Sequence, residues 1–277
     1  MNNMKITPFV KWAGGKTQLI DKLISKKPNE FNNYYEPFIG GGAFLYELKP
    51  ENAIIGDINE QLINVYKQIK IVPEELIMEI NTMDSHECDK EYYLDIRSSF
   101  NDKIIKNELD VECAAKFIWL NKHCFNGLYR VNQKGLFNVP YNNKKNGYSI
   151  VEENIRNISR FLNDSNIKII SADFEEICAT VKKGDFVYFD SPYVPESETA
   201  YFTDYTKNGF NKDDHERLAR LYKDLDKRGA YLMLSNNNVP IVHELYKEFN
   251  IEEIEVKRLI NRNANKRKGK EVIITNY

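Results

Sequence analysis

The sequence predicts an α/β fold built on a doubly wound, largely parallel sheet. Short apolar runs that are typical of buried strands occur at residues 34–35, 53–55, 167–170, 186–189, 231–234 and 272–274. Helical patterns lie between several of these runs, at residues 60–69, 213–227 and 240–249. Strands that alternate with helices indicate such a sheet, in which ligands bind at the carboxyl ends of the strands. The residues of chemical interest follow the first four runs, in the order Gly40, Asp57, Asp173 and Asp190.

The middle of the chain breaks this alternation. From about residue 73 to residue 163, the helical patterns at residues 74–83 and 111–123 have no strand pattern between them. Residues 125–141 are rich in Asn, Gly and aromatic side chains, which suggests a hairpin or a structured loop. A chain of 277 residues has room for one core with an inserted subdomain. We therefore expect an insertion that supplies specificity, residues 73–163, within a core made of residues 1–72 and 164–277.

Charge and targeting patterns limit the partners and the compartment. The 39 Lys and Arg residues and 41 Asp and Glu residues leave a net charge of -2, so any nucleic-acid site must be a local patch. Residues 257–270 contain seven basic residues and no acid, which fits a solvated loop or a phosphate-contacting loop. The four cysteines have no metal-ligand spacing, residues 1–8 lack the apolar core of a signal peptide, and no apolar run is long enough to span a bilayer. We expect a cytoplasmic monomer with free thiols and no membrane partner.

A glycine turn and an acid indicate a ribose-bearing cofactor. Gly40, Gly41 and Gly42 follow the first apolar run, where glycines let the backbone approach a ligand closely. Asp57 follows the second run, where an acid can bind ribose hydroxyls. NAD remains open on these features, although the glycine spacing differs from the dinucleotide fingerprint. A Walker loop ending in Gly-Lys-Thr is excluded, because Val10 stands where that motif needs glycine.

The segment from Asp190 to Tyr193 is the most informative motif. An Asp at a strand end can accept a hydrogen bond from an exocyclic amine. Pro192 holds Ser191 in extended geometry, which can aim the Ser191 carbonyl at the same amine. Tyr193 offers a face on which a planar ring can stack. The motif favours methyl transfer to an amine on such a ring, and a strand followed by a proline turn is the structural alternative.

Five motifs occur along the chain in one order: residues 11–16, 37–42, 57–59, 125–130 and 190–193. Together they resemble the motifs of Dam-type DNA adenine-N6 methyltransferases, in the alpha arrangement of amino-methyltransferases. The resemblance covers essentially the whole chain. It implies a Rossmann-like S-adenosylmethionine-dependent methyltransferase sheet with an inserted, mostly helical DNA-recognition subdomain that contains a hairpin. It also implies that no metal ion takes part.

The resemblance assigns roles to individual residues. S-adenosylmethionine would contact Trp12, Lys16, Phe38, Gly40, Gly42, Asp57, Asp173, Phe174 and Asp190. The catalytic residues would be Asp190, Ser191, Pro192 and Tyr193, acting on an adenine that is flipped out of the duplex. Double-stranded DNA, with GATC as the expected site, would contact Lys11, Phe125, Asn126, Leu128, Arg130 and Pro140.

Several of these roles have structural alternatives. Arg130 is the candidate for bidentate contact with guanine O6 and N7, and a salt bridge inside the insertion is its alternative. Lys11 would contact another guanine. Phe125 and Asn126 would fill or support the gap beside the flipped base, and Leu128 and Pro140 would touch bases in the major groove. Core packing is the alternative for Phe125 and Leu128. Residues 235–237 either line the target pocket or form a turn.

Ser191 departs from the family pattern, which usually has proline there. The hydrogen bond assigned to this position comes from a backbone carbonyl, which serine retains, but serine does not restrict its own φ. We expect retained chemistry at a reduced rate. The alternatives are a catalytically impaired DNA-binding relative and a methyltransferase that acts on RNA or on protein glutamine.

Overall fold

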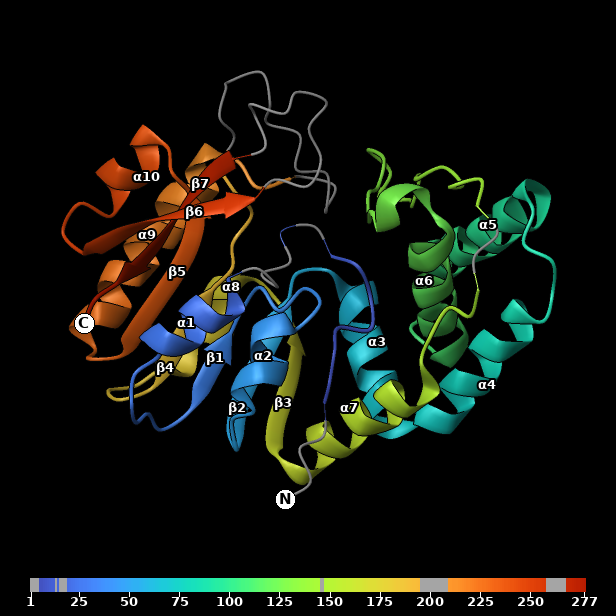
Figure 1. The fold of residues 1–277 in the computed structure, drawn as a ribbon, viewed down its shortest axis with the longest axis horizontal. Coiled ribbons are helices and arrows are strands. Elements are labelled where there is room, and N and C mark those ends of the chain that lie inside the picture. The colour runs from blue at the N-terminus through green and yellow to red at the C-terminus, as the bar shows by residue number, and fades with distance from the viewer. Residues whose placement is uncertain (1–4, 13, 15–18, 145–146, 195–208, 258–267) are drawn as a thin grey trace.

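The computed structural model describes residues 5–12, 14, 19–144, 147–194, 209–257 and 268–277 (Figure 1). Its centre is a seven-stranded sheet with the strand order β3-β2-β1-β4-β5-β7-β6. The strands are β1 (Tyr34–Glu36), β2 (Asn52–Asp57), β3 (Asn166–Ser171), β4 (Phe186–Phe189), β5 (Tyr231–Asn237), β6 (Asn250–Lys257) and β7 (Lys268–Thr275).

The strand order reverses at β1. This strand pairs in parallel with β2 on one side and with β4 on the other. Strands β3 and β5 extend the parallel part, while β7 runs antiparallel to β5, and β6 runs antiparallel to β7. The carboxyl ends of β1 and β4 therefore meet at a topological switch point, where open α/β sheets bind their ligands.

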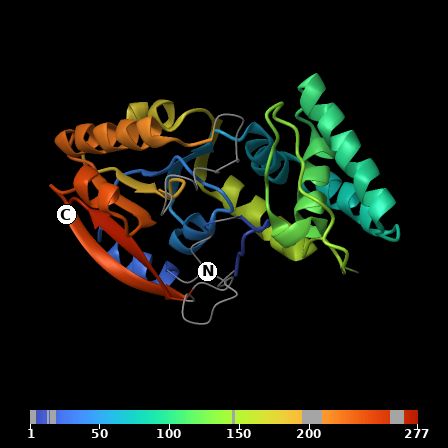
Figure 2. The same ribbon diagram turned by 90° about the horizontal axis from the view of Figure 1, so that it is seen from above.

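The apolar runs form strands because helices cover both faces of the sheet, so that successive side chains are buried on opposite sides. Phe186 and Tyr188 pack with the helices α1 (Ile20–Lys26), α2 (Ala43–Leu48) and α3 (Glu60–Ile71). Val187 and Phe189 pack with α8 (Phe174–Ile177), α9 (Lys212–Lys227) and α10 (Pro240–Leu245). Figure 2 shows α8 and α9 on one side of the sheet and α1 and α2 on the other.

Between β2 and β3 the chain forms a helical part that contributes no strand to the sheet in the region described. It contains α4 (Pro73–Asp84), α5 (Lys90–Lys106), α6 (Val111–His123) and α7 (Glu152–Asp164). α4, α5 and α6 lie at the far end of the molecule from β6 and β7 (Figure 1). After α6, a short 3-10 turn (Phe125–Gly127) leads into a loop closed by antiparallel bridges between Cys124 and Tyr141 and between Val131 and Phe137.

The predicted α/β class and the Rossmann-like sheet are confirmed, and each of the six apolar runs lies in a strand. The prediction missed β6, because its three Glu residues obscure the apolar pattern. Within the described residues β6 pairs only with β7, so it is an edge strand, where charged side chains are common. The helix expected at residues 240–249 ends at Leu245, and Phe249 instead packs into the core beside Tyr222.

Phe186 provides a test of the core at the switch point. Its side chain is fully buried and contacts the rings of Phe31, Tyr34 and Phe44. We expect Phe186→Ala to lower the free energy of unfolding by about 3–5 kcal/mol, because it leaves a cavity among these rings. Urea unfolding measures the change. Phe125→Ala, at a ring that is 51% exposed, is the matched control and should change stability by less than about 0.5 kcal/mol. Equal losses in both variants would contradict the assigned burial.

Candidate active site

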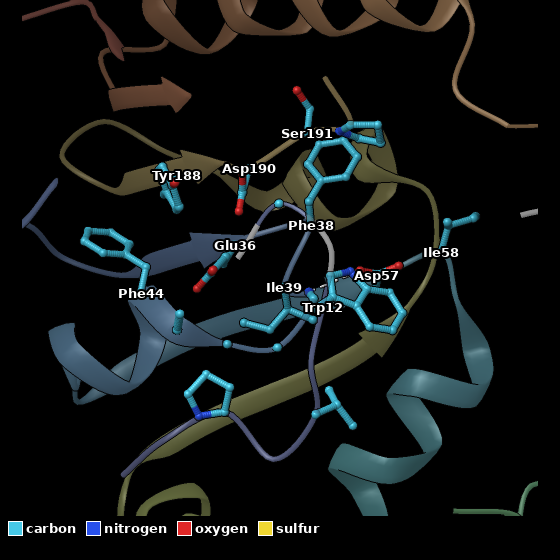
Figure 3. Close-up of a pocket in the computed structure, with 18 of the residues that line it drawn as sticks. Trp12, Glu36, Phe38, Ile39, Phe44, Asp57, Ile58, Tyr188, Asp190 and Ser191 are labelled. Carbon is cyan, nitrogen blue, oxygen red and sulfur yellow. Dashed lines mark hydrogen bonds between the residues drawn. The ribbon is translucent and has the colours of Figure 1, made fainter. Parts of the chain in front are cut away.

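A cavity of about 660 Å³ opens at the carboxyl ends of β1, β2 and β4 (Figure 3). The N-terminal segment, the turn after β1, the end of β2 and the segment after β4 line it. Tyr188 and Phe44 lie toward one side in Figure 3, and Trp12 and Asp57 toward the other. Of the residues predicted to bind the cofactor or act in catalysis, those that line the cavity are Trp12, Phe38, Gly40, Gly42, Asp57, Asp190, Ser191, Pro192 and Tyr193. Lys16 lies outside the described residues.

The glycine turn after β1 forms the floor on which Trp12 lies. Gly40 has φ +47°, and a Cβ atom there would lie 2.6 Å from Trp12 Cδ1. Any side chain at this position would therefore displace the indole. The turn is held from two directions, because Gly40 N donates to Asp57 Oδ2 (3.3 Å) and the Gly40 carbonyl accepts from Tyr66 Oη (3.0 Å).

Asp57 is a buried acid at the end of β2. Its Oδ1 accepts a hydrogen bond from Asn59 N at 3.0 Å, in addition to the bond from Gly40 N to Oδ2. Burial raises the pKa of the Asp57 carboxyl to about 6, although the backbone hydrogen bonds from Asn59, Gly40 and Ile58 act to lower it. The carboxylate is therefore costly to keep in the cavity wall, and a ligand that donates hydrogen bonds to it would offset that cost.

Glu36, which the sequence analysis did not select, also lines the cavity. It ends β1, is 2% exposed, and accepts a hydrogen bond from Tyr34 Oη at 2.7 Å. Burial raises the pKa of the Glu36 carboxyl well above its ordinary value, and the nearby charge of Asp190 raises it further. Its place at the carboxyl end of a strand, directly before the glycine turn, is the sequence signal that would have identified it. Glu36, Asp57 and Asp190 therefore place three carboxyl groups in the lining of one cavity, which favours a cationic ligand.

Hydrogen bonds from neighbouring strands orient the two ends of the Asp190–Tyr193 motif. Asp190 Oδ1 accepts from Ser235 Oγ (3.2 Å), and Ser235 Oγ in turn lies 2.9 Å from Tyr188 Oη. Tyr193 Oη donates to Glu271 Oε2 at 2.6 Å. Burial, with the charges of Asp190 and Glu271, raises the pKa of the Tyr193 phenol, so the ring stays neutral. The phenol is thus fixed at its hydroxyl end.

Ser191 is integrated into the site by its side chain. It is 2% exposed, and its Oγ accepts a hydrogen bond from Asn236 Nδ2 at 3.3 Å. Asn236 Oδ1 also accepts from Val194 N at 3.0 Å. The hydroxyl is therefore paired with β5, and the same amide holds the chain three residues further on. Of residues 235–237, Ser235 and Asn236 contact the motif directly.

Asp173 and Phe174 lie behind the cavity wall and do not line it. The Asp173 side chain caps α8 through Glu175 N (3.0 Å) and pairs with Arg217 Nη2 (2.9 Å). The Phe174 ring is buried against the Phe38 ring, with 5.5 Å between centroids. Phe38 does line the cavity, so this pair of residues supports the wall that it forms.

The residues predicted to contact DNA, apart from Lys11, lie on the turn and loop that follow α6. Phe125, Asn126, Leu128, Arg130 and Pro140 are all exposed. Phe125 is 51% and Leu128 36% exposed, so neither is a core side chain.

Hydrogen bonds hold this loop. Arg130 Nε donates to Asn138 Oδ1 (2.8 Å), which is a neutral partner. Phe125 N donates to the Pro140 carbonyl at 2.8 Å, which brings the two ends of this loop together. Lys11 is exposed and lines the cavity.

Comparisons with known proteins agree with this arrangement. Residues 12–260 match the family model described as D12 class N6 adenine-specific DNA methyltransferase. The chain is 48% identical to the Type II methyltransferase M1.LlaDCHI of Lactococcus lactis subsp. cremoris, over 100% of this chain and 97% of that protein. It is 45% identical to the Type II methyltransferase M.MjaIII of Methanocaldococcus jannaschii (99% and 100%). It is 34% identical to a DNA adenine methylase of Vibrio cholerae (92% and 90%).

The family match extends over most of the chain, and the relatives are similar along nearly their whole length. The chain therefore belongs to the D12 class of N6 adenine-specific DNA methyltransferases. It is an enzyme whose substrate is DNA. None of the helices in the described ranges has the length and apolar character needed to cross a bilayer.

The raised pKa of Asp57 predicts a pH dependence of stability. An unfolded Asp titrates near pH 4, so between about pH 4 and pH 6 the folded chain binds the proton more readily than the unfolded chain. As the pH rises through this window, wild type should lose on the order of 2–3 kcal/mol of stability relative to Asp57→Asn, whose side chain does not titrate. Urea unfolding of both proteins from pH 4.5 to pH 8 measures the difference. Parallel curves would contradict the raised pKa.

Proposed function

We propose that the enzyme transfers the methyl group of S-adenosylmethionine to N6 of the adenine in GATC sites of double-stranded DNA. The adenine is flipped out of the duplex into the cavity. The observation that supports this proposal most strongly is the convergence of Asp190, Ser191 and Tyr193 on a cavity that Asp57 and the glycine turn also line.

The cavity has the features that this cofactor requires. The absence of a side chain at Gly40 makes room for the indole of Trp12, which lines the cavity, and the wall includes the apolar side chains of Phe38 and Ile58. Asp57 is suited to ribose hydroxyls, and the buried Glu36 carboxyl is suited to a positive charge. When bound, the cofactor supplies an electrophilic methyl group on a sulfonium centre.

The residues of the motif would act on the adenine. The amine of adenine is a poor nucleophile, because its lone pair is delocalised into the ring. Asp190 and the Ser191 carbonyl would accept its two hydrogens, which favours a more tetrahedral nitrogen. Stacking on Tyr193, whose hydroxyl is held by Glu271, would offset part of the few kcal/mol that base flipping costs. Positioning of the reactants then accounts for much of the rate.

The insertion, residues 73–163, would recognise the target. Its exposed turn carries Phe125, and Leu128 directly follows the turn; both are large apolar side chains that are better suited to contacts with bases than to solvent. The guanidinium of Arg130 is held by Asn138 and is suited to guanine O6 and N7. Lys11 lies at the cavity edge, where it would contact a second guanine. DNA as the substrate supports a cytoplasmic enzyme, and we infer that it acts as a monomer.

The alternatives from the sequence have less support. A catalytically impaired relative is disfavoured, because the Ser191 hydroxyl has a partner in Asn236 and does not disturb the motif. Methylation of RNA or of protein glutamine is disfavoured because the chain belongs to a family described as N6 adenine-specific DNA methyltransferases.

The test is transfer of labelled methyl from S-adenosylmethionine to a short duplex that contains GATC, with a GTTC duplex as control. We expect label on GATC only. Asp190→Asn, which keeps the size of the side chain, should reduce transfer by at least about 100-fold, because it loses the charge that polarises the amine. Label on both duplexes would contradict GATC specificity. Silence on GATC by wild type and by Ser191→Pro would point to another site or substrate.

Arg130 gives a prediction for specificity. We expect Arg130→Ala to reduce the preference for GATC over a duplex with its guanine replaced by adenine by roughly 10- to 100-fold, as loss of a bidentate contact requires. The ratio of kcat/KM on the two duplexes measures it. Lys134→Ala, at another exposed cation of the same loop, is the control, and it should lower both rates by a similar factor. An unchanged ratio in Arg130→Ala would remove Arg130 from recognition.

A further inference from the structure

Two asparagines hold the N-terminal segment in the same way. Asn121 Oδ1 accepts from Lys11 N, and its Nδ2 donates to the Lys11 carbonyl, both at 2.9 Å. Asn154 makes the same pair of bonds with Thr7, at 3.0 and 2.9 Å. Each side-chain amide thus pairs with one backbone residue much as a neighbouring strand would. Asn121 lies on α6 and Asn154 on α7, so both attach this segment to the helical part of the chain.

Asn121 differs from Asn154 in its burial and in one additional bond. Its Nδ2 also donates to the Gly127 carbonyl at 2.9 Å, in the turn that carries Phe125 and Asn126. Asn121 is 5% exposed, so these bonds are shielded from water. One buried amide therefore joins the backbone of Lys11 to the backbone of the exposed turn. Removal of this amide would leave buried backbone groups without partners, which is costly.

Packing at Gly127 reinforces the connection. Gly127 has φ +65°, and a Cβ atom there would lie 2.8 Å from Lys11 Cβ and 2.6 Å from Lys11 Cδ. The stem of Lys11 therefore lies directly on the turn. Because Lys11 Cβ cannot move without its backbone, a side chain at position 127 would push the segment away from the turn.

The residue after Lys11 belongs to the cofactor cavity. The indole of Trp12 lines it and lies on Gly40. Trp12 also stacks with Phe117 of α6 (6.3 Å between centroids) and with Tyr129 (5.7 Å), which lies two residues after the turn. The wall of the cavity and the DNA-contacting turn are therefore held by one packed unit.

We propose that Asn121 is a positioning residue that couples cofactor binding to DNA binding, by holding the Lys11–Trp12 segment against the turn at residues 125–127. This inference rests on the proposed function, in which Trp12 contacts the cofactor and the turn contacts DNA. A ligand that orders Trp12 also orders the turn through Asn121, so the second ligand meets a site that is already arranged. The effect is reciprocal, since each ligand must tighten the other by the same factor.

The experiment measures this factor directly. S-adenosylhomocysteine, the cofactor without its transferable methyl, is titrated calorimetrically with and without a GATC duplex. The labelled duplex is titrated by fluorescence anisotropy with and without saturating S-adenosylhomocysteine. For wild type we expect each ligand to lower the Kd of the other at least about fivefold. For Asn121→Ala we expect the factor to fall below about twofold, with both ligands still bound.

Asn154→Ala is the matched control, because it removes an equivalent pair of backbone bonds, at Thr7 of the same segment, and Asn154 has no bond to the turn among the described contacts. It should keep the wild-type factor. Gly127→Ala tests the connection from the other side and should also lower the factor, so the inference does not depend on the folding of Asn121→Ala alone.

The outcomes separate the two proposals. If wild type binds both ligands without coupling, or if Asn121→Ala and Gly127→Ala keep the full factor, the coupling role is wrong while the proposed function stands. A loss of coupling in Asn154→Ala as well would reduce Asn121 to a general structural role and overturn the inference. Wild type that binds neither ligand would overturn the proposed function, and this inference with it.

Discussion

The site depends on the position of β1 between β2 and β4. Parallel pairing on both sides of this strand brings the carboxyl ends of all three strands to one edge, where the chain leaves in different directions. Glu36, Asp57 and Asp190 end or follow these strands, so residues that are far apart in sequence line a single cavity. β4 lies inside the sheet and is covered by helices on both faces. Its side chains are therefore buried and apolar on both sides.

Buried polar groups at this edge are retained at a cost in stability. Burial raises the pKa of Glu36 and Asp57, which means that the folded chain disfavours their charges when the cavity holds no cation. Asp57 is kept in place by backbone donors, and Glu36 by the Tyr34 hydroxyl. Such an arrangement is typical of a site prepared for a ligand, because an opposite charge or a set of hydroxyl donors restores what desolvation removed.

The predictions of the fold class and of the family succeeded, because they rest on short patterns and on their order. Each apolar run could be recognised from neighbouring residues, and the order of the motifs indicated the family. The roles assigned to the glycine turn and to the Asp190–Tyr193 motif stay predictions. Strand β6 was missed because its charged residues suit an edge strand and obscure the apolar alternation. Glu36 and Asn121 were missed because an acid or an amide has no distinctive local pattern, and their roles depend on burial and on partners far along the chain.

By itself, the sequence determined the class of fold, the family and the chemical character of the reaction, because each follows from short patterns and from their order. The tertiary structure decided which groups act together. It brought Ser235, Asn236 and Glu271 to the Asp190–Tyr193 motif, and it put Asp173 and Phe174 behind the cavity wall. It also joined Lys11 to the exposed turn through Asn121. Contacts of this kind depend on strand order and helix packing, which bring distant residues within hydrogen-bond distance and remove them from water.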